Sequence, residues 1–352
     1  MNVLLSCVGR RDYLVEYFRQ ALNGSGEVLA TNSYAEAAGM LAADRAFVLP
    51  RVDDPGYIEA LLELCARERV GLLLSLFDLD VAVLTPMRDR FLSIGTVLVA
   101  SSPDVVELCF DKWRSHGFLT GIGLRSPRTY LSLEDARRAV ADGSLAFPLV
   151  VKPRWGTGSI ALEYAEDLEE LDFTYKRVRK RLAGSYLACR SLADLEHDVL
   201  IQERLVGIEY GLDVVNDLRG EQAACFVKQK LEMRSGETDR AVTLDDPQLE
   251  AVGLCIAGKL RHVGNLDVDI IRVGSEPYVL EMNPRFGGLY PFSHVAGANI
   301  PAALLAWARG EEPLLEWLKV RPNVLSVKGI RMLSASESAE AGSTDSVFER
   351  TV

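Results

Sequence analysis

The feature that most constrains the fold is a pair of apolar runs that end in oxygen-bearing side chains. The first run, residues 265–272, carries Asp269; the second, residues 278–282, carries Glu281 and is followed by Asn283. A glycine-serine pair between the runs predicts an antiparallel hairpin. Side chains two apart on a strand share one face, so Glu281 and Asn283 are expected to lie together with Asp269 beside them.

These three side chains are candidate metal ligands. Carboxylate and amide oxygens suit a hard cation such as Mg²⁺ and leave coordination positions for nucleotide phosphates. Asp267 shares the face of Asp269, but Asp269 is ranked first because it lies twelve residues before Glu281. The alternative is that both carboxylates are solvent-facing charges on an ordinary strand pair.

The residues after the second run point to an anion. Pro284 lacks a backbone donor and ends the strand, and Arg285 supplies a planar cation with five donors. Gly287 and Gly288 permit close backbone approach to a bound group. A cation, a metal site and a glycine turn together indicate phosphate binding.

A second candidate phosphate site follows an apolar run that ends in Lys152. The lysine can place a compact charge on phosphates, and the small-residue loop after it offers backbone N–H groups. The loop residues are Gly156, Thr157, Gly158 and Ser159. The spacing differs from a Walker-type loop, and the alternative is a glycine hairpin with an exposed lysine. Trp155 is bulky for such a loop and either covers the site or packs against a neighbouring lobe.

A third segment, residues 200–210, is a strand that enters a linker. Linker backbone groups could pair with an adenine edge, and Glu209 offers a carboxylate suited to ribose hydroxyls. Taken by itself, the segment favours a plain strand-turn-strand.

The chain divides by pattern into four parts. In residues 1–110 short apolar runs alternate with amphipathic segments, which predicts a parallel sheet covered by helices. Residues 111–198 are expected to form a small central lobe with the glycine loop, and residues 199–333 an antiparallel α+β lobe with the metal site. Residues 334–352 are small, polar and acidic, and are expected to be a flexible tail. The predicted fold class is mixed α/β and α+β.

Charge and patterning exclude several functions. With 39 basic and 50 acidic residues the net charge is −11, which disfavours nucleic acid as a partner. No apolar run approaches the length needed to cross a bilayer, and the first apolar run is too short for a signal peptide, so a cytoplasmic protein without a membrane partner is expected. The cysteines and histidines lack the spacing of a zinc site.

The ordered set of motifs resembles the ATP-grasp superfamily, in the branch similar to the large subunit of carbamoyl phosphate synthase. The resemblance covers about residues 1–310. It is carried by Asp111-Lys112, Lys152-Pro153-Arg154, the glycine loop, the segment from Gln202 to Glu209, and Glu281-Met282-Asn283-Pro284-Arg285. It implies an ATP-grasp fold with ATP between the central and C-terminal lobes.

The resemblance also implies a role for each matching residue. Lys112 and Lys152 would bind ATP phosphates, Glu203 and Leu205 would bind adenine through backbone groups with Gln202 close by, and Glu209 would hold the ribose. One or two Mg²⁺, for which Mn²⁺ can substitute, would be bound by Asp269, Glu281 and Asn283. Arg285, with Lys230, would stabilise the transferring phosphoryl group.

The implied reaction is ADP-forming ligation of a small carboxylate, typically an amino acid, to an amine through an acyl phosphate. A homodimer is compatible with this expectation. The alternatives are a bicarbonate-phosphorylating enzyme of carbamoyl phosphate synthase or carboxylase type, a non-catalytic ATP-binding module, and a dinucleotide oxidoreductase. The last lacks its glycine fingerprint after the first apolar run.

Overall fold

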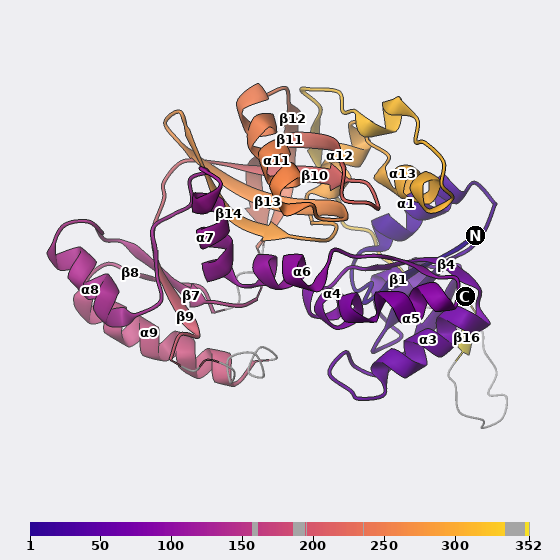
Figure 1. Cartoon of the computed structure of the whole chain (residues 1–352), viewed down its shortest axis with the longest axis horizontal. Helices are drawn as coiled ribbons and strands as arrows, with labels where there is room; N and C mark the ends of the chain where they lie inside the picture. Colours follow the sequence, from indigo (N-terminus) through magenta and orange to yellow (C-terminus); the bar gives the residue numbers. More distant parts are fainter. Residues whose placement is uncertain (157–160, 186–193, 195, 235, 335–348, 352) are drawn as a thin grey trace.

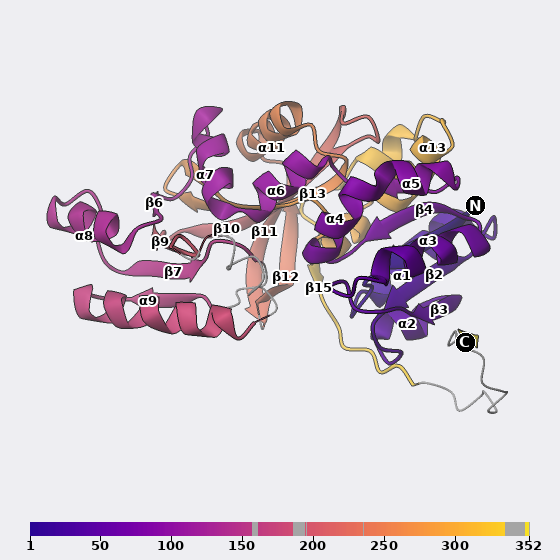
Figure 2. The same cartoon turned by 60° about the horizontal axis from the view of Figure 1, so that its bottom comes forward.

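Three sheets organise the computed structural model, which describes residues 1–156, 161–185, 194, 196–234, 236–334 and 349–351. The N-terminal domain and the central lobe lie at opposite ends of the molecule, and the C-terminal sheet lies between them (Figures 1 and 2). The expected fold class, a parallel α/β domain with a small central lobe and an antiparallel C-terminal lobe, is confirmed, and the sheet of the central lobe is antiparallel as well.

The N-terminal sheet is parallel in the order β3-β2-β1-β4-β5, and β16 pairs antiparallel with β3 at its edge. Its strands are β1 (Asn2–Ser6), β2 (Val28–Asn32), β3 (Arg45–Val48), β4 (Val70–Ser75), β5 (Val97–Val99) and β16 (Glu349–Thr351). The helices of this domain are α1 (Asp12–Leu22), α2 (Ala38–Ala42), α3 (Tyr57–Arg67), α4 (Asp78–Leu84) and α5 (Arg88–Ser93). Apolar residues on both faces of β1, including Leu4 and Leu5, are fully buried, as expected for a parallel sheet covered on both sides.

The central lobe is an antiparallel sheet in the order β6-β9-β7-β8 with two helices. Its elements are β6 (Thr129–Tyr130), α8 (Leu133–Ala141), β7 (Leu149–Pro153), β8 (Glu163–Ala165), α9 (Leu168–Ala183) and β9 (Val199–Glu203). Because β9 pairs with β6 and β7, this sheet extends past the boundary expected at residue 198.

The C-terminal sheet is antiparallel in the order β14-β13-β10-β11-β12-β15. Its strands are β10 (Ile208–Asn216), β11 (Gln222–Arg234), β12 (Glu237–Leu244), β13 (Gly264–Val273), β14 (Glu276–Asn283) and β15 (Leu325–Val327). The helices α6 (Pro103–Phe110), α7 (Lys112–Gly121) and α11 (Pro247–Leu260) contribute to one apolar core with β10, β13 and β14. The segment expected to open the central lobe, α7, therefore packs on the C-terminal sheet.

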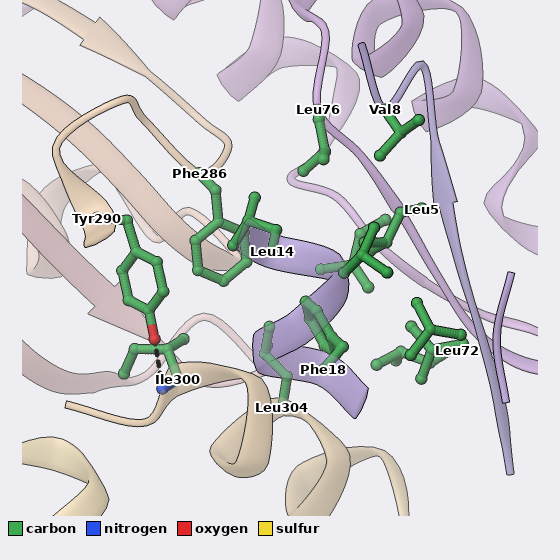
Figure 3. Close-up of a cluster of buried hydrophobic side chains, with 14 of the residues drawn as sticks. Leu5, Val8, Leu14, Phe18, Leu72, Leu76, Phe286, Tyr290, Ile300 and Leu304 are labelled. Carbon is green, nitrogen blue, oxygen red and sulfur yellow. Dashed lines mark hydrogen bonds between the residues drawn. The ribbon is translucent and has the colours of Figure 1, made fainter. Parts of the chain in front are cut away.

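One core joins the N-terminal domain to the C-terminal lobe. Phe18 of α1 packs edge-on against Phe286, whose ring also contacts Tyr290 of α12 (Tyr290–Val295) (Figure 3). The Tyr290 hydroxyl accepts a hydrogen bond of 3.0 Å from the backbone N–H of Ile300, the first residue of α13 (Ile300–Ala308). Phe286 directly follows Arg285, so this core anchors the end of the predicted phosphate motif.

No helix among the described residues is long and apolar enough to cross a membrane.

A buried polar network supports the C-terminal sheet below the hairpin. Lys228 and Asp213 are fully buried and form an ion pair, and Ser293 hydrogen-bonds to both, at 2.9 Å from the lysine and 2.6 Å from the carboxylate. Asn265 donates a 3.2 Å hydrogen bond to Asp213 and a 3.4 Å one to the carbonyl oxygen of Arg285. The network thus connects β10 and β11 to Arg285, two residues after the end of β14.

We expect Lys228→Met to lower the free energy of unfolding by about 3–5 kcal/mol, because it leaves the Asp213 charge buried without its partner. Urea denaturation measures this loss. Arg261→Met is the matched control: it breaks an exposed pair with Glu221 in the same lobe and should cost no more than about 1 kcal/mol. A Lys228→Met loss as small as that of the control would contradict the prediction.

Candidate active site

A cavity of about 640 Å³ lies where the three sheets meet. It is lined by residues of the central lobe, such as Lys152, by residues of the C-terminal sheet, and by Asp78 of the N-terminal domain. Of the residues predicted from sequence, those that line it are Lys152, Gln202, Glu203, Leu205, Glu209, Lys230, Asp269, Glu281, Asn283 and Arg285. The folded chain therefore brings together segments that are about 130 residues apart in sequence, between Lys152 and Arg285.

The predicted hairpin forms, and its register places Asp269 opposite Glu281 and Asp267 opposite Asn283. Since alternate residues share a face, all four side chains line the cavity from one side of the sheet. Gly287 has a role that the sequence did not indicate. A Cβ at this position would lie 2.1 Å from Cγ of Asp267, so glycine is needed there for the carboxylate to fit.

Lys230 of β11 lies beside the hairpin. Its Nζ atom is 2.6 Å from Oδ1 of Asp269 and 4.0 Å from a carboxylate oxygen of Glu209. Burial opposes the charge of this lysine, but the Asp269 carboxylate raises its pKa above the ordinary value. Lys230 therefore stays protonated across the physiological range and can place a positive charge in the cavity.

Arg285 connects two domains through ion pairs. Its guanidinium lies 3.1 Å from Asp78 at the start of α4 and 3.3 Å from Asp267 of β13. Burial opposes the guanidinium charge, yet the two carboxylates raise the pKa of Arg285. Asp78 was not found from the sequence, since it lies 207 residues before its partner and in no motif.

Asp267 is the most perturbed carboxyl group of the cavity. Burial and the charge of Asp269 raise its pKa to about 7, against the opposing charge of Arg285. Its Oδ1 atom is buried and has no hydrogen-bond partner among the described residues. A buried carboxylate oxygen without a partner is a place where a cation or a donor can bind. The sequence placed Asp267 on this face but ranked it below Asp269.

Two lysines, Lys112 and Lys152, lie near the carboxylate of Glu281. Lys112 Nζ lies 3.9 Å from Glu281 and donates a hydrogen bond to the carbonyl oxygen of Gly156. Burial alone would raise the pKa of Glu281, but the charges of Lys112 and Lys152 hold it below the ordinary value. Burial and the neighbouring Lys112 charge lower the pKa of Lys152 to about 8, although Glu281 acts in the opposite direction. Two like charges held close together suit a polyanionic ligand between them.

The rest of the predicted glycine loop, Thr157, Gly158 and Ser159, lies outside the described residues. Trp155 is buried and packs with Phe110, Leu182 and Leu79. Of the two roles expected for this side chain, the structure shows packing between lobes.

Glu203 also lines the cavity, but its side chain forms hydrogen bonds with other residues of the protein. Its carboxylate accepts hydrogen bonds of 2.8 Å from the backbone N–H of Arg128 and 2.9 Å from the Arg128 guanidinium. Gln202 donates a 2.8 Å hydrogen bond to Thr129. Residues 204–207 connect β9 to β10 outside both strands and line the cavity. This arrangement leaves the linker backbone, rather than the Glu203 carboxylate, to meet a ligand.

The donors of the hairpin fit a magnesium ion shared with phosphates. Among the described residues, no group of three or more His, Cys, Asp or Glu side chains forms a closed metal cluster. Mg²⁺ in nucleotide sites is instead held by one or two carboxylates together with phosphates and water. Asp269, Glu281 and Asn283 offer oxygen atoms on one face, and the partnerless Oδ1 of Asp267 lies on the same face.

The fold and the site together define a nucleotide-binding protein in which two antiparallel lobes enclose a cavity with lysines, an arginine and carboxylates. A family model for the ATP-grasp domain matches residues 109–289, just over half of the chain, and a model for the PylC-like N-terminal domain matches residues 3–99. The chain belongs to the ATP-grasp family. The expected family is thereby confirmed.

A curated relative supports the expected branch. The carbamoyl phosphate synthase large chain of Myxococcus xanthus (strain DK1622) is 26% identical over 267 residues, which is 71% of this chain. The match spans 23% of the length of that relative.

Solved structures share the fold at low sequence identity. The biotin carboxylase domain of Hydrogenobacter thermophilus 2-oxoglutarate carboxylase, solved with MgADP and bicarbonate, has a TM-score of 0.72 at 16% identity and covers 92% of this chain and 73% of its own. An L-amino acid ligase from Bacillus licheniformis has a TM-score of 0.64 at 17% identity and covers 91% of this chain and 77% of its own. A Staphylococcus aureus N5-carboxyaminoimidazole synthetase bound to ADP has a TM-score of 0.68 at 15% identity, covering 93% and 79%.

The lowered pKa of Lys152 predicts a pH dependence of ATP binding. Below about pH 8 the lysine is protonated and can pair with phosphate; above it the charge is lost, so affinity should fall by up to about tenfold per pH unit. Titration calorimetry with MgATP between about pH 7.5 and 9.5 measures this change. In Lys152→Arg the side chain stays charged, and the slope should flatten. Parallel profiles for the two proteins would exclude Lys152 as the titrating group.

Proposed function

We propose that this chain is an ATP- and Mg²⁺-dependent ligase that phosphorylates a small carboxylate and transfers the acyl group to an amine. The observation that carries the proposal is the convergence of Lys152, Lys230 and Arg285 with the oxygen donors of the hairpin in one cavity. Phosphoryl transfer is catalysed chiefly by positioning and by neutralising charge, and these groups supply both. We extend the proposal to amino acids as substrates because the fold of this chain is similar to that of an L-amino acid ligase from B. licheniformis.

The proposed binding of ATP follows the length of the cavity. Adenine would meet the backbone of Glu203 and Leu205, ribose would meet Glu209, and Lys112 and Lys152 would hold the phosphates. Bound at Asp269, Glu281 and Asn283, Mg²⁺ would offset the charge of the phosphate oxygens.

In the proposed first step, an oxygen of the substrate carboxylate attacks the γ-phosphorus. The bond to the β-phosphate oxygen breaks, and ADP leaves. Arg285 and Lys230 neutralise the transferred group, and both side chains are already held by carboxylates before substrate arrives. In the second step the amine nitrogen attacks the acyl carbon, phosphate leaves, and the nitrogen loses a proton to give an amide.

A second candidate is phosphorylation of bicarbonate. It is favoured by the match to a carbamoyl phosphate synthase large chain and by the fold shared with a biotin carboxylase domain that was solved with bicarbonate. The ATP site would be the same, so the two candidates differ only in the acceptor.

A coupled assay of ADP release with MgATP and pairs of amino acids distinguishes the two candidates. We expect release that needs both an acid and an amine, with a product mass equal to the two substrates minus one water. Release that needs bicarbonate instead would favour the second candidate. Binding of MgATP without ADP release under any of these conditions would contradict both and favour a non-catalytic module.

Glu281→Gln should lower substrate-dependent ADP release by about 10²-fold or more, because it removes a charge opposite Lys112 and Lys152 and a proposed metal ligand. The matched control is Glu276→Gln at the other end of the same strand, where the side chain is exposed and paired with Arg125. The control should keep nearly full activity. Equal activities of the two variants would exclude the proposed role of Glu281.

A further inference from the structure

A second cavity, of about 1010 Å³, lies in the N-terminal domain beside the carboxyl ends of β1, β2 and β4. Most of its exposed lining is apolar. The apolar lining includes Val8, Leu49, Val52, Leu76, Phe77 and Val83. Its volume is at the upper end of the range of about 300–1,000 Å³ seen for small-molecule sites. Neither the motifs nor the proposed ATP contacts account for it.

Hydrogen bonds hold one wall of this cavity in place. Tyr57 lines the cavity, and its hydroxyl donates a 2.7 Å hydrogen bond to the buried Asp80, which also accepts one from Ser6 at the end of β1. A buried carboxylate that joins a strand end to a helix fixes the Tyr57 ring. The cavity is therefore a preformed feature of the domain.

The second cavity meets the first. Arg11, Leu76, Phe77 and Glu237 line both of them. Arg11 donates a 3.2 Å hydrogen bond to the carbonyl oxygen of Phe286, and Arg285 donates one of the same length to the same oxygen. This shared acceptor places the two guanidinium groups next to each other, so a ligand in the second cavity can reach the phosphoryl-transfer end of the first.

Arg11 differs from the other arginines that line the second cavity. Arg10 pairs with Glu237 at 3.3 Å, and Arg51 pairs with Asp53 at 3.0 Å. In the described part of the chain, Arg11 has no carboxylate within 4.0 Å; its contacts are Phe286 and the hydroxyl of Tyr13. The charge of Glu237 acts on Arg11 from beyond ion-pair distance, so the guanidinium at the mouth of this apolar cavity is free to pair directly with a carboxylate ligand.

One polar side chain in the lining, Asn32, has a donor without a hydrogen-bond partner among the described residues. The side-chain nitrogen of Asn32, at the end of β2, is buried and makes no hydrogen bond to the described residues. A ligand that accepts a hydrogen bond from this nitrogen would satisfy the buried donor.

We infer that the second cavity binds the carboxylate substrate of the reaction proposed above, and that this substrate is a carboxylic acid with a bulky apolar body. The inference rests on the proposed function. The apolar body occupies the N-terminal cavity, and the carboxylate lies against Arg11, from where one oxygen reaches the γ-phosphate beside Arg285. An amino acid with a large apolar side chain meets these requirements.

The test begins with a panel of acids in the ADP-release assay, with MgATP and glycinamide as the amine. The panel is L-phenylalanine, L-leucine, 3-phenylpropionate, L-glutamate and acetate, with L-phenylalaninol as an apolar analogue that lacks the carboxylate. We expect the three apolar acids to exceed glutamate and acetate at least tenfold in kcat/KM, and phenylalaninol to be inactive.

Two variants fill the cavity. Leu49→Trp, and Val83→Phe as a smaller change, should lower kcat/KM for the apolar acids at least tenfold and leave the Kd for MgATP within twofold. Leu92→Trp is the matched control, because it makes the same change at an exposed position of the same domain. Arg11→Gln should raise KM for the apolar acids at least tenfold, whereas Arg138→Gln on the exposed face of α8 should not.

The outcomes separate this inference from the proposed function. Failure of the wild-type protein to bind MgATP would overturn both. With MgATP bound, the inference is overturned if glutamate, acetate or bicarbonate is the preferred acceptor, if no acid of the panel releases ADP, or if both cavity-filling variants behave like Leu92→Trp.

Discussion

The ion pairs of Arg285 are the interaction on which the rest of the site depends. One guanidinium bridges Asp78, from the first helix turn after β4, and Asp267, from the C-terminal sheet. The next residue, Phe286, enters the core shared by α1 and α13, so the arginine is held by charge on one side and by packing on the other. The N-terminal domain and the C-terminal sheet are thereby held in one geometry.

This arrangement also explains how so many charges are tolerated in one cavity. Each cation of the phosphate end has a carboxylate nearby: Lys230 has Asp269, Arg285 has Asp78 and Asp267, and Lys112 has Glu281. Without a ligand, the carboxylates offset the desolvation of the cations. Under the proposed function, a bound nucleotide and its metal ion would replace these internal pairs: the phosphates would pair with the cations, and the carboxylates would hold Mg²⁺. The perturbed pKa values of Lys152 and Asp267 mark the two groups whose charge is least compensated.

Much of the fold was predictable because its signals are local. The hairpin that brings Asp269 beside Glu281 followed from strand periodicity and a turn. The domain boundary at residue 198 was less accurate, because the pairing of β9 with β6 joins residues about 70 positions apart and has no local signature. For the same reason the sequence did not reveal Asp78 as a partner of Arg285 or the close approach of Asp267 to Gly287. Most predicted residues of the motifs line the cavity, whereas Lys112 and Gly156 do not, and the ion pairs within the cavity were not predictable.

Arg11 lines both cavities, and its place at the start of α1 links the two cavities through that helix. Arg11 directly precedes α1. It donates a hydrogen bond to the carbonyl oxygen of Phe286, which also accepts one from Arg285. The packing of α1 against Phe286 holds Arg11 and Arg285 next to each other. A shift of the N-terminal domain that moved the mouth of its cavity would therefore also move the proposed phosphoryl-transfer end of the first cavity. In a parallel α/β domain, ligands bind beside the carboxyl ends of the strands, where the second cavity lies. Under the proposed function, this edge of the sheet would give an acceptor molecule a short path to ATP. Acceptor specificity could then vary in the N-terminal domain while the nucleotide site stayed the same.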